Sequence, residues 1–121
     1  MPVTGFDHFQ LAIPEGGEEK ARSFFVDLLG MEEVAKPAAL SPKGCWFTAG
    51  TAALHVGIDP DFRPARKAHP ALLVGDLESL RKRLEAAGMP TRDEIPLEGY
   101  RRFFTEDPFG NRIELMQKAQ A

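Results

Sequence analysis

Three histidines and one glutamate occupy matching places in two halves of the chain. His8 and His69 each open a short apolar run, while His55 and Glu114 each lie in an apolar run that closes a half. His55 follows His8 by 47 residues, and Glu114 follows His69 by 45. Imidazole and carboxylate groups are suitable ligands for Zn, Ni, Fe(II), Mn or Co. Each residue taken alone is more often structural, but their repetition predicts that they bind one divalent metal ion.

Alternation along the predicted strands supports this interpretation. Side chains on a strand point alternately to its two faces. His8 lies opposite Leu11, and His55 and Glu114 are each flanked by aliphatic residues that point the other way. The run after His69 is apolar on both faces and is less decisive. The candidate ligands therefore share the more polar face, as a concave site requires.

The elements that must position these side chains also repeat. Apolar residues at i, i+3 and i+4 spacing predict helices over residues 18–29 and 77–87. Asp76 is a candidate N-cap for the second helix. Gly30 and Gly88 stand where each helix should end in a left-handed residue.

Short strands are predicted before and after each helix. They cover residues 6–13, 32–35, 45–48, 52–58, 69–74, 91–95, 103–105 and 112–117. Each half is therefore a strand, a helix and about three strands. This predicts an α+β fold made of two βαβββ modules with mixed sheets that curl around a shared concave surface. We expect one domain over residues 1–121, with module 1 at about 5–58, a linker at about 59–67 and module 2 at about 68–118.

Composition excludes several classes of function. The formal net charge of −3 argues against a nucleic-acid partner, which needs a concentrated basic surface. No apolar run approaches the roughly 20 residues that span a bilayer, so we expect no membrane partner. The single cysteine, Cys45, suits a reducing compartment and reads as a buried apolar residue. We expect a cytoplasmic protein that binds a small molecule.

Three stretches carry a family resemblance: the opening Asp7-His8, the end of the first helix at residues 24–31, and the motif Glu-Asp-Pro-Phe-Gly-Asn-Arg-Ile-Glu-Leu at 106–115. Through them the whole chain resembles the vicinal oxygen chelate superfamily, which includes glyoxalase I, fosfomycin-resistance thiol transferases, extradiol dioxygenases and bleomycin-resistance proteins. The resemblance implies a glyoxalase-like half-open barrel of paired modules. It implies metal ligands at His8, His69 and Glu114. Family modules pair within one chain or swap between two chains, so we expect a homodimer.

His55 departs from the family pattern. Glyoxalase I has a glutamate at the corresponding place, which binds the metal and takes part in proton transfer. A histidine there can be a fourth ligand or, standing off the metal, a general base. We therefore name His55 and Glu114 as the candidate catalytic residues. Extradiol dioxygenases use an additional catalytic histidine and tyrosine. In this chain, His55 and Tyr100 are the candidates for those two roles.

Several cationic residues and the single tyrosine are candidate substrate contacts. Arg63 and Arg66 precede His69 and can clamp a carboxylate or phosphate, although the sequence favours a solvated linker over such a clamp. Arg101 and Arg102 alternate, so one of them should point toward the site. Tyr100 adjoins this pair.

Three functions follow from these residues and the resemblance. The leading one is a metal-dependent lyase or isomerase that chelates adjacent oxygens of a substrate and transfers a proton. The second is a ring-cleaving or other Fe(II) dioxygenase, since two histidines and one carboxylate also suit dioxygen activation. The third is a metal-free protein of the bleomycin-resistance type that sequesters a small molecule, for which four ligand-type residues have no evident use.

Overall fold

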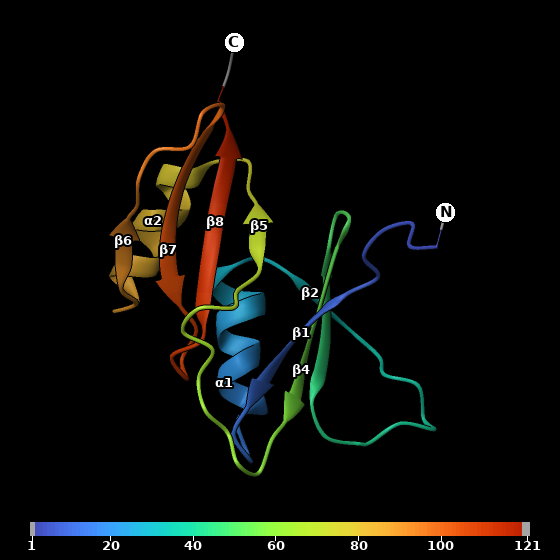
Figure 1. The fold of residues 1–121 in the computed structure, drawn as a ribbon. Helices are drawn as coiled ribbons and strands as arrows, with labels where there is room; N and C mark the ends of the chain where they lie inside the picture. Colours follow the sequence, from blue (N-terminus) through green and yellow to red (C-terminus); the bar gives the residue numbers. More distant parts are fainter. Residues whose placement is uncertain (1, 120–121) are drawn as a thin grey trace. The chain divides into compact units, whose positions relative to one another are not determined.

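The computed structural model describes residues 2–119. The chain forms two compact units, Met1–Arg63 and Pro64–Ala121. Each unit contains a mixed four-stranded sheet and a helix that follows the first strand of that sheet (Figure 1). This is an α+β fold of two βαβββ modules, as the periodicity of the sequence predicts.

Unit 1 begins with the strand that follows His8. Its elements are β1 (Phe9–Ile13), α1 (Glu18–Arg22), the π-helical η1 (Ser23–Leu28), β2 (Glu32–Val34), β3 (Cys45–Ala49) and β4 (Ala52–Ile58). The strand order is β1-β4-β3-β2, with β1 parallel to β4 and the other pairs antiparallel. The shared backbone ladder between β1 and β4 places the first and last strands of the module side by side.

The first helix differs from the expected single α-helix over 18–29. Its second half is π-helical, and the Leu29 N–H donates to the Phe24 carbonyl, five residues back, at 3.0 Å. This wider turn lets two consecutive aromatic side chains, Phe24 and Phe25, enter the core, where they are 1% and 0% exposed. Gly30 then adopts a φ of 76°, which confirms it as the left-handed residue that ends the helix.

Unit 2 repeats the arrangement. Its elements are β5 (Ala71–Leu73), α2 (Leu77–Ala86), β6 (Thr91–Asp93), β7 (Tyr100–Glu106) and β8 (Arg112–Lys118), in the order β5-β8-β7-β6. Asp76 accepts a hydrogen bond from the Ser79 N–H at 3.1 Å, which confirms the predicted N-cap. Strand β7 starts three residues before the predicted 103–105 run, because its first residues pair with the end of β8.

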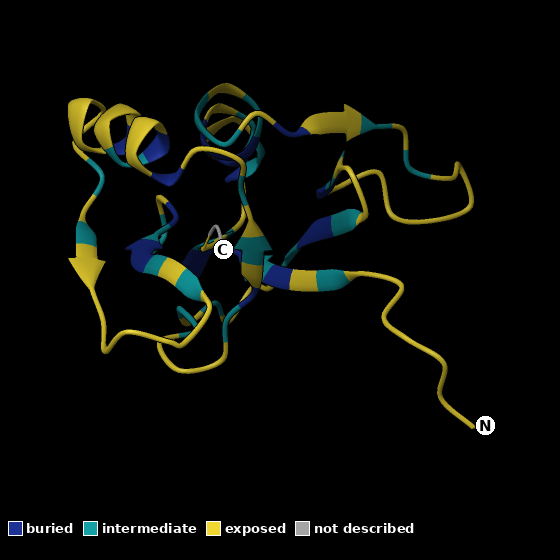
Figure 2. Ribbon diagram, turned by 90° about the horizontal axis from the view of Figure 1, so that it is seen from above, coloured by how far each residue is buried: buried dark blue, intermediate teal, exposed yellow. Residues whose placement is uncertain are grey.

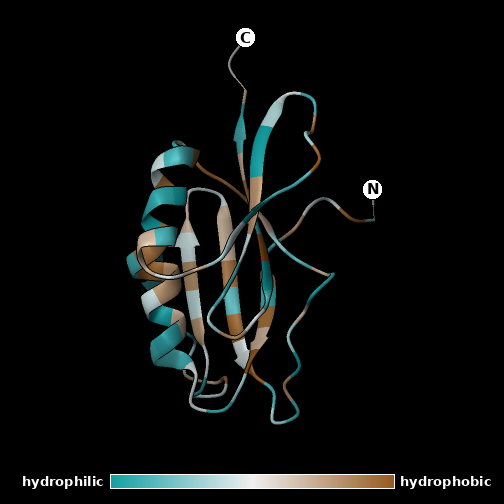
Figure 3. Cartoon of the chain, turned by 90° about the vertical axis from the view of Figure 1, so that its left-hand side faces the viewer, coloured by the Kyte–Doolittle hydropathy of each residue, from teal (hydrophilic) through white to brown (hydrophobic). Residues whose placement is uncertain are grey.

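Each sheet has one face under its helix and one open face. The helix-covered side is lined by residues that are at most 3% exposed, including Leu11, Phe47 and Leu54 in unit 1 and Phe103 and Leu115 in unit 2. Both helices are exposed on their outer sides and buried toward the strands (Figure 2). Hydrophilic and hydrophobic residues both occur along the strands (Figure 3). They alternate from Arg112 to Leu115 in β8, whereas β5 is apolar throughout. On each strand, the side chains that alternate with these buried residues point to the open face, the face of the sheet that no helix covers. These open faces carry the candidate ligands.

Each unit also contains a polar contact between its own helix and the edge strand of its own sheet. Arg22 on α1 donates to Glu33 on β2 at 2.9 Å, and Arg81 on α2 donates to Asp93 on β6 at 2.6 Å. Half-exposed ion pairs of this kind contribute little stability. Their equivalence shows that the internal repeat extends beyond the histidines and Glu114.

Candidate functional site

A histidine–carboxylate pair lies on the open face of unit 2. His69 precedes β5, and Glu114 lies in β8, where it is the register partner of Ala71 on β5. The Glu114 N–H donates to the Pro70 carbonyl at 3.0 Å, which fixes the backbone beside His69. Imidazole Nε2 lies 2.9 Å from carboxylate Oε1, and Glu114 is only 6% exposed. Strand pairing thus brings together two residues that are 45 positions apart.

Both members of this pair are oriented by further contacts. His69 Nδ1 lies 2.8 Å from the Lys67 carbonyl oxygen, which can only accept, so Nδ1 carries the hydrogen. The other carboxylate oxygen of Glu114 accepts a hydrogen bond from Arg102 Nη1 at 3.1 Å. Arg102 is itself held by Nη2, which donates to the Ile95 carbonyl at 2.7 Å. Such outer contacts are typical of metal-binding histidines and carboxylates.

The geometry of the pair suits a cation. With the hydrogen on Nδ1, a neutral His69 presents the Nε2 lone pair to a carboxylate oxygen, so two acceptors face each other at 2.9 Å. A proton on Nε2 or a shared metal ion resolves that repulsion. Imidazole nitrogen and carboxylate oxygen bind first-row divalent metals at about 2.0–2.2 Å, which is compatible with two ligand atoms at this separation. These residues therefore fit a divalent metal.

The other two histidines meet on the open face of unit 1. The rings of His8 and His55 stack with centroids 4.1 Å apart, and Trp46 stacks on the other side of His55, also at 4.1 Å. Trp46 and His55 are register partners on β3 and β4. Asp7 Oδ2 lies 2.9 Å from His8 Nδ1. Burial, and then the neighbouring His8, lower the pKa of His55, which keeps its ring neutral and able to bind a metal or accept a proton.

The four predicted ligands therefore occur as two pairs. His69 Nε2 and Glu114 Oε1 lie 2.9 Å apart, and His8 and His55 are in stacking contact. Within the described part of the chain, residues 2–119, no three side chains of histidine, cysteine, aspartate or glutamate converge as a metal cluster. Each unit supplies half of the predicted ligand set.

The predicted substrate contacts are distributed over unit 2 and the segment before it. Arg102 binds Glu114, whereas Arg101 lies on the other side of β7 and binds Glu78 at 3.1 Å. Arg63 and Arg66 are exposed. Tyr100 is partly buried and lines a cavity of about 340 Å³ together with residues of α2 and Arg101. Of these five residues, Arg102 is the one in direct contact with a predicted ligand.

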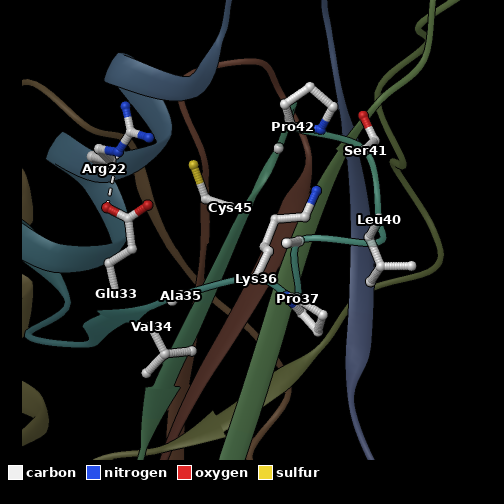
Figure 4. A pocket seen from close by; sticks show the side chains of 12 residues that line it. Arg22, Glu33, Val34, Ala35, Lys36, Pro37, Leu40, Ser41, Pro42 and Cys45 are labelled. Atoms are coloured by element: carbon white, nitrogen blue, oxygen red, sulfur yellow. Dashed lines mark hydrogen bonds and ion pairs between the residues drawn. The ribbon is translucent and has the colours of Figure 1, made fainter.

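A cavity of about 500 Å³ in unit 1 lies away from the candidate ligands. It is bounded by the 35–44 segment and by Arg22, Glu33 and Cys45 (Figure 4). Arg22 and Glu33 neutralise each other, and burial raises the pKa of the Cys45 thiol to about 11. Cys45 is therefore an unreactive core residue, as expected from the sequence. Trp46, the next residue along β3, points instead to the open face and stacks on His55.

Some residues of the open face of unit 2 were not among the predicted contacts. The ring of Phe104 packs edge-on against His69, with centroids 5.1 Å apart. The guanidinium groups of Arg92 and Arg112 lie 5.5 and 5.1 Å from the centre of the same ring. Alternation along a strand already places Arg112 on the same face as Glu114, so the position of Arg112 could have been predicted from the sequence. The position of Arg92 depends on the pairing of β6 with β7 and carries no such signal.

The fold and these two pairs of residues define a βαβββ protein with histidine and carboxylate side chains on the faces of its sheets that no helix covers. The chain belongs to the Glyoxalase/Bleomycin resistance protein/Dioxygenase superfamily, whose family model matches residues 5–115. The resemblance seen in the sequence is thereby confirmed. No curated protein matches the chain.

Solved structures support the same family. A protein from Bacillus anthracis assigned to the glyoxalase family is 41% identical, with 97% of each chain covered and a TM-score of 0.90. The fosfomycin resistance protein FosX from Listeria monocytogenes is 19% identical over 97% of this chain and 95% of its own, with a TM-score of 0.76. A variant of that protein was solved with Mn(II) and 1S,2S-dihydroxypropylphosphonic acid, at 18% identity, coverage of 97% and 94%, and a TM-score of 0.78. At these lower identities the similarity establishes the fold.

Across residues 2–119, neither helix has the length and apolar character needed to cross a bilayer.

Proposed function

We propose that this protein is a metal-dependent enzyme of the glyoxalase type that acts on a small substrate with adjacent oxygen atoms. The observation that carries the proposal is the His69–Glu114 pair, in which imidazole Nε2 and carboxylate Oε1 lie 2.9 Å apart and both groups are held by outer contacts. A sequestering protein has no use for such an arrangement. The Mn(II) bound to the fosfomycin resistance protein variant is consistent with a metal in this fold.

The proposed ligands are His69 and Glu114 from unit 2 and His8 from unit 1, either of the same chain or of a second copy in a homodimer. When bound, the divalent ion would stabilise negative charge on a substrate oxygen. The Lys67 carbonyl keeps the hydrogen of His69 on Nδ1, so that Nε2 is free to coordinate. Arg102 holds the second oxygen of Glu114 and limits rotation of the carboxylate.

His55 is the proposed proton acceptor or a fourth ligand. Burial, and then the neighbouring His8, lower the pKa of His55, which favours the neutral ring that a base requires. The rings of Trp46 and His8 on either side restrict its orientation and exclude water from both of its faces. A neutral, fixed imidazole beside His8 supports proton transfer of the isomerase or lyase type as the reaction class.

Metal analysis tests the proposal. Protein purified without chelator should contain nearly one divalent ion per chain, and His69→Ala and His8→Ala should each lose it, as measured by elemental analysis. Zn or Ni would favour proton transfer, and Fe(II) would favour the dioxygenase alternative. Protein that stays metal-free after addition of Zn, Ni, Mn and anaerobic Fe(II) would instead identify a sequestering protein.

Elemental analysis also distinguishes the two possible roles of His55, a general base and a metal ligand. If His55 is a base, His55→Gln keeps the metal of the wild-type protein, and measured occupancy stays within error. If occupancy falls as it does in His8→Ala, His55 is a ligand. The matched control is Gln10→Ala, which changes an exposed side chain whose residue is the register partner of His55 on β1.

A further inference from the structure

Three arginines line a small cavity on unit 2. Arg66, Arg92 and Arg112 border a space of about 150 Å³ together with Thr105, Glu106 and Gly110. They come from three separate segments: the stretch before His69, strand β6 and strand β8. The cavity therefore gathers positive charges that lie up to 46 positions apart in the sequence.

These three guanidinium groups lack a carboxylate partner within the part of the chain that the structure describes. Among residues 2–119, no carboxylate forms an ion pair or hydrogen bond with Arg66, Arg92 or Arg112, whereas Arg22, Arg81, Arg101 and Arg102 all have one. Glu106 faces Arg112 in the β7–β8 register, yet it forms no ion pair with it. Three cations and one carboxylate leave the lining with two excess positive charges. Such mutual repulsion is relieved when a counter-ion binds.

The backbone holds the cluster in place. The Ala65 N–H donates to Asn111 Oδ1 at 2.8 Å, and the Arg112 N–H donates to the Ala65 carbonyl at 2.8 Å. These bonds fix the residue before Arg66 beside the start of β8. Arg92 and Arg112 both lie over the ring of Phe104, which restricts their motion. A site whose donors are already ordered loses less entropy on binding.

We propose that Arg66, Arg92 and Arg112 form a binding site for a tetrahedral dianion, the phosphate or phosphonate group of a small molecule. Guanidinium groups recognise such oxyanions through paired N–H donors, and a dianion matches the two excess positive charges. The cavity has roughly the volume of five water molecules at about 30 Å³ each. It therefore accommodates one oxyanion group and not a nucleotide.

The location of this site gives it a role in substrate binding. The ring of Phe104 lies within 5.5 Å of the guanidinium groups of Arg92 and Arg112, and it also packs edge-on against His69. A molecule anchored by its anionic end would lie along Phe104 toward the His69–Glu114 pair. The anion site itself needs no metal, so it can be tested apart from the proposed enzymatic function.

Calorimetric titration of the full chain with inorganic phosphate, at constant ionic strength, tests the proposal. We expect one saturable site per chain, weakened at least about tenfold by Arg92→Gln or Arg112→Gln, because each removes a charge-assisted donor pair. The control is Lys82→Gln, which removes one exposed charge from α2, the helix on the Phe103 side of the sheet. It should change the affinity by less than about twofold. Acetate should bind far more weakly than phosphate.

Other outcomes would overturn the site. Equal weakening in Lys82→Gln would show that phosphate responds to general surface charge. Loss of phosphate binding in His8→Ala, which lies in unit 1, would show that the anion is held by a metal. Acetate binding as strong as phosphate binding would rule out a tetrahedral dianion. Unchanged affinity in both arginine variants would remove the cluster from any anion site.

Discussion

Glu114→Gln should weaken metal binding by at least roughly 100-fold, more than the 10–100-fold loss typical of outer-shell changes. The substitution removes the negative charge and one strong oxygen donor from the His69–Glu114 pair. It should not unfold the protein, because the amide keeps both local contacts. Its oxygen can accept from Arg102, and its N–H can donate to the Nε2 lone pair of His69.

Metal titration and thermal unfolding of the metal-free protein measure the two parts of this expectation. Glu106→Gln is the matched control, since Glu106 lies on the neighbouring strand β7 and makes no ion pair within the described residues. It should leave metal affinity unchanged. Wild-type metal affinity in Glu114→Gln would exclude Glu114 as a ligand. A large loss of thermal stability without metal would show that the pair is structural.

Local patterns explain why much of the fold was predictable. A strand places His55 opposite Leu54 and Val56 whatever its tertiary surroundings, so the polar and apolar faces can be read from alternation. Asp76 and Gly88 act within one turn of the helix that they begin and end. Because both halves carry the same signals, an ambiguous strand in one half could be assigned from its counterpart in the other.

The rest depends on contacts between segments that are distant in sequence. The π-helical turn at Ser23–Leu28 follows from packing Phe24 and Phe25 together in the core, and helical periodicity does not distinguish it from an α-helix. The stacking of Trp46 on His55 requires the register of β3 against β4. The arginine cluster requires three separate segments to line one cavity. Charge and spacing alone favour a solvated linker for Arg66.

The turn between β7 and β8 contains a buried polar network. Asp107 Oδ1 accepts from the backbone N–H groups of Phe109 and Asn111, and its Oδ2 accepts from the Asn111 side chain at 2.8 Å. Burial raises the pKa of Asp107, although these hydrogen bonds oppose the rise. Asn111 Oδ1 in turn accepts from the Ala65 N–H. Asn111 thus connects the β7–β8 turn to the segment that carries Arg66.

Asn111→Ala should lower the free energy of unfolding by about 2–4 kcal/mol, measured by urea denaturation at neutral pH. Asn111 is 1% exposed, so its loss leaves the Ala65 N–H and one oxygen of the Asp107 carboxylate without those partners. Each buried group left unsatisfied costs about 1–3 kcal/mol. Gln10→Ala, which removes an exposed amide, should change stability by less than about 0.5 kcal/mol. An effect of Asn111→Ala no larger than that of Gln10→Ala would mean that water replaces the lost amide, and the Arg66 segment would then owe its position to the Arg112–Ala65 backbone bond.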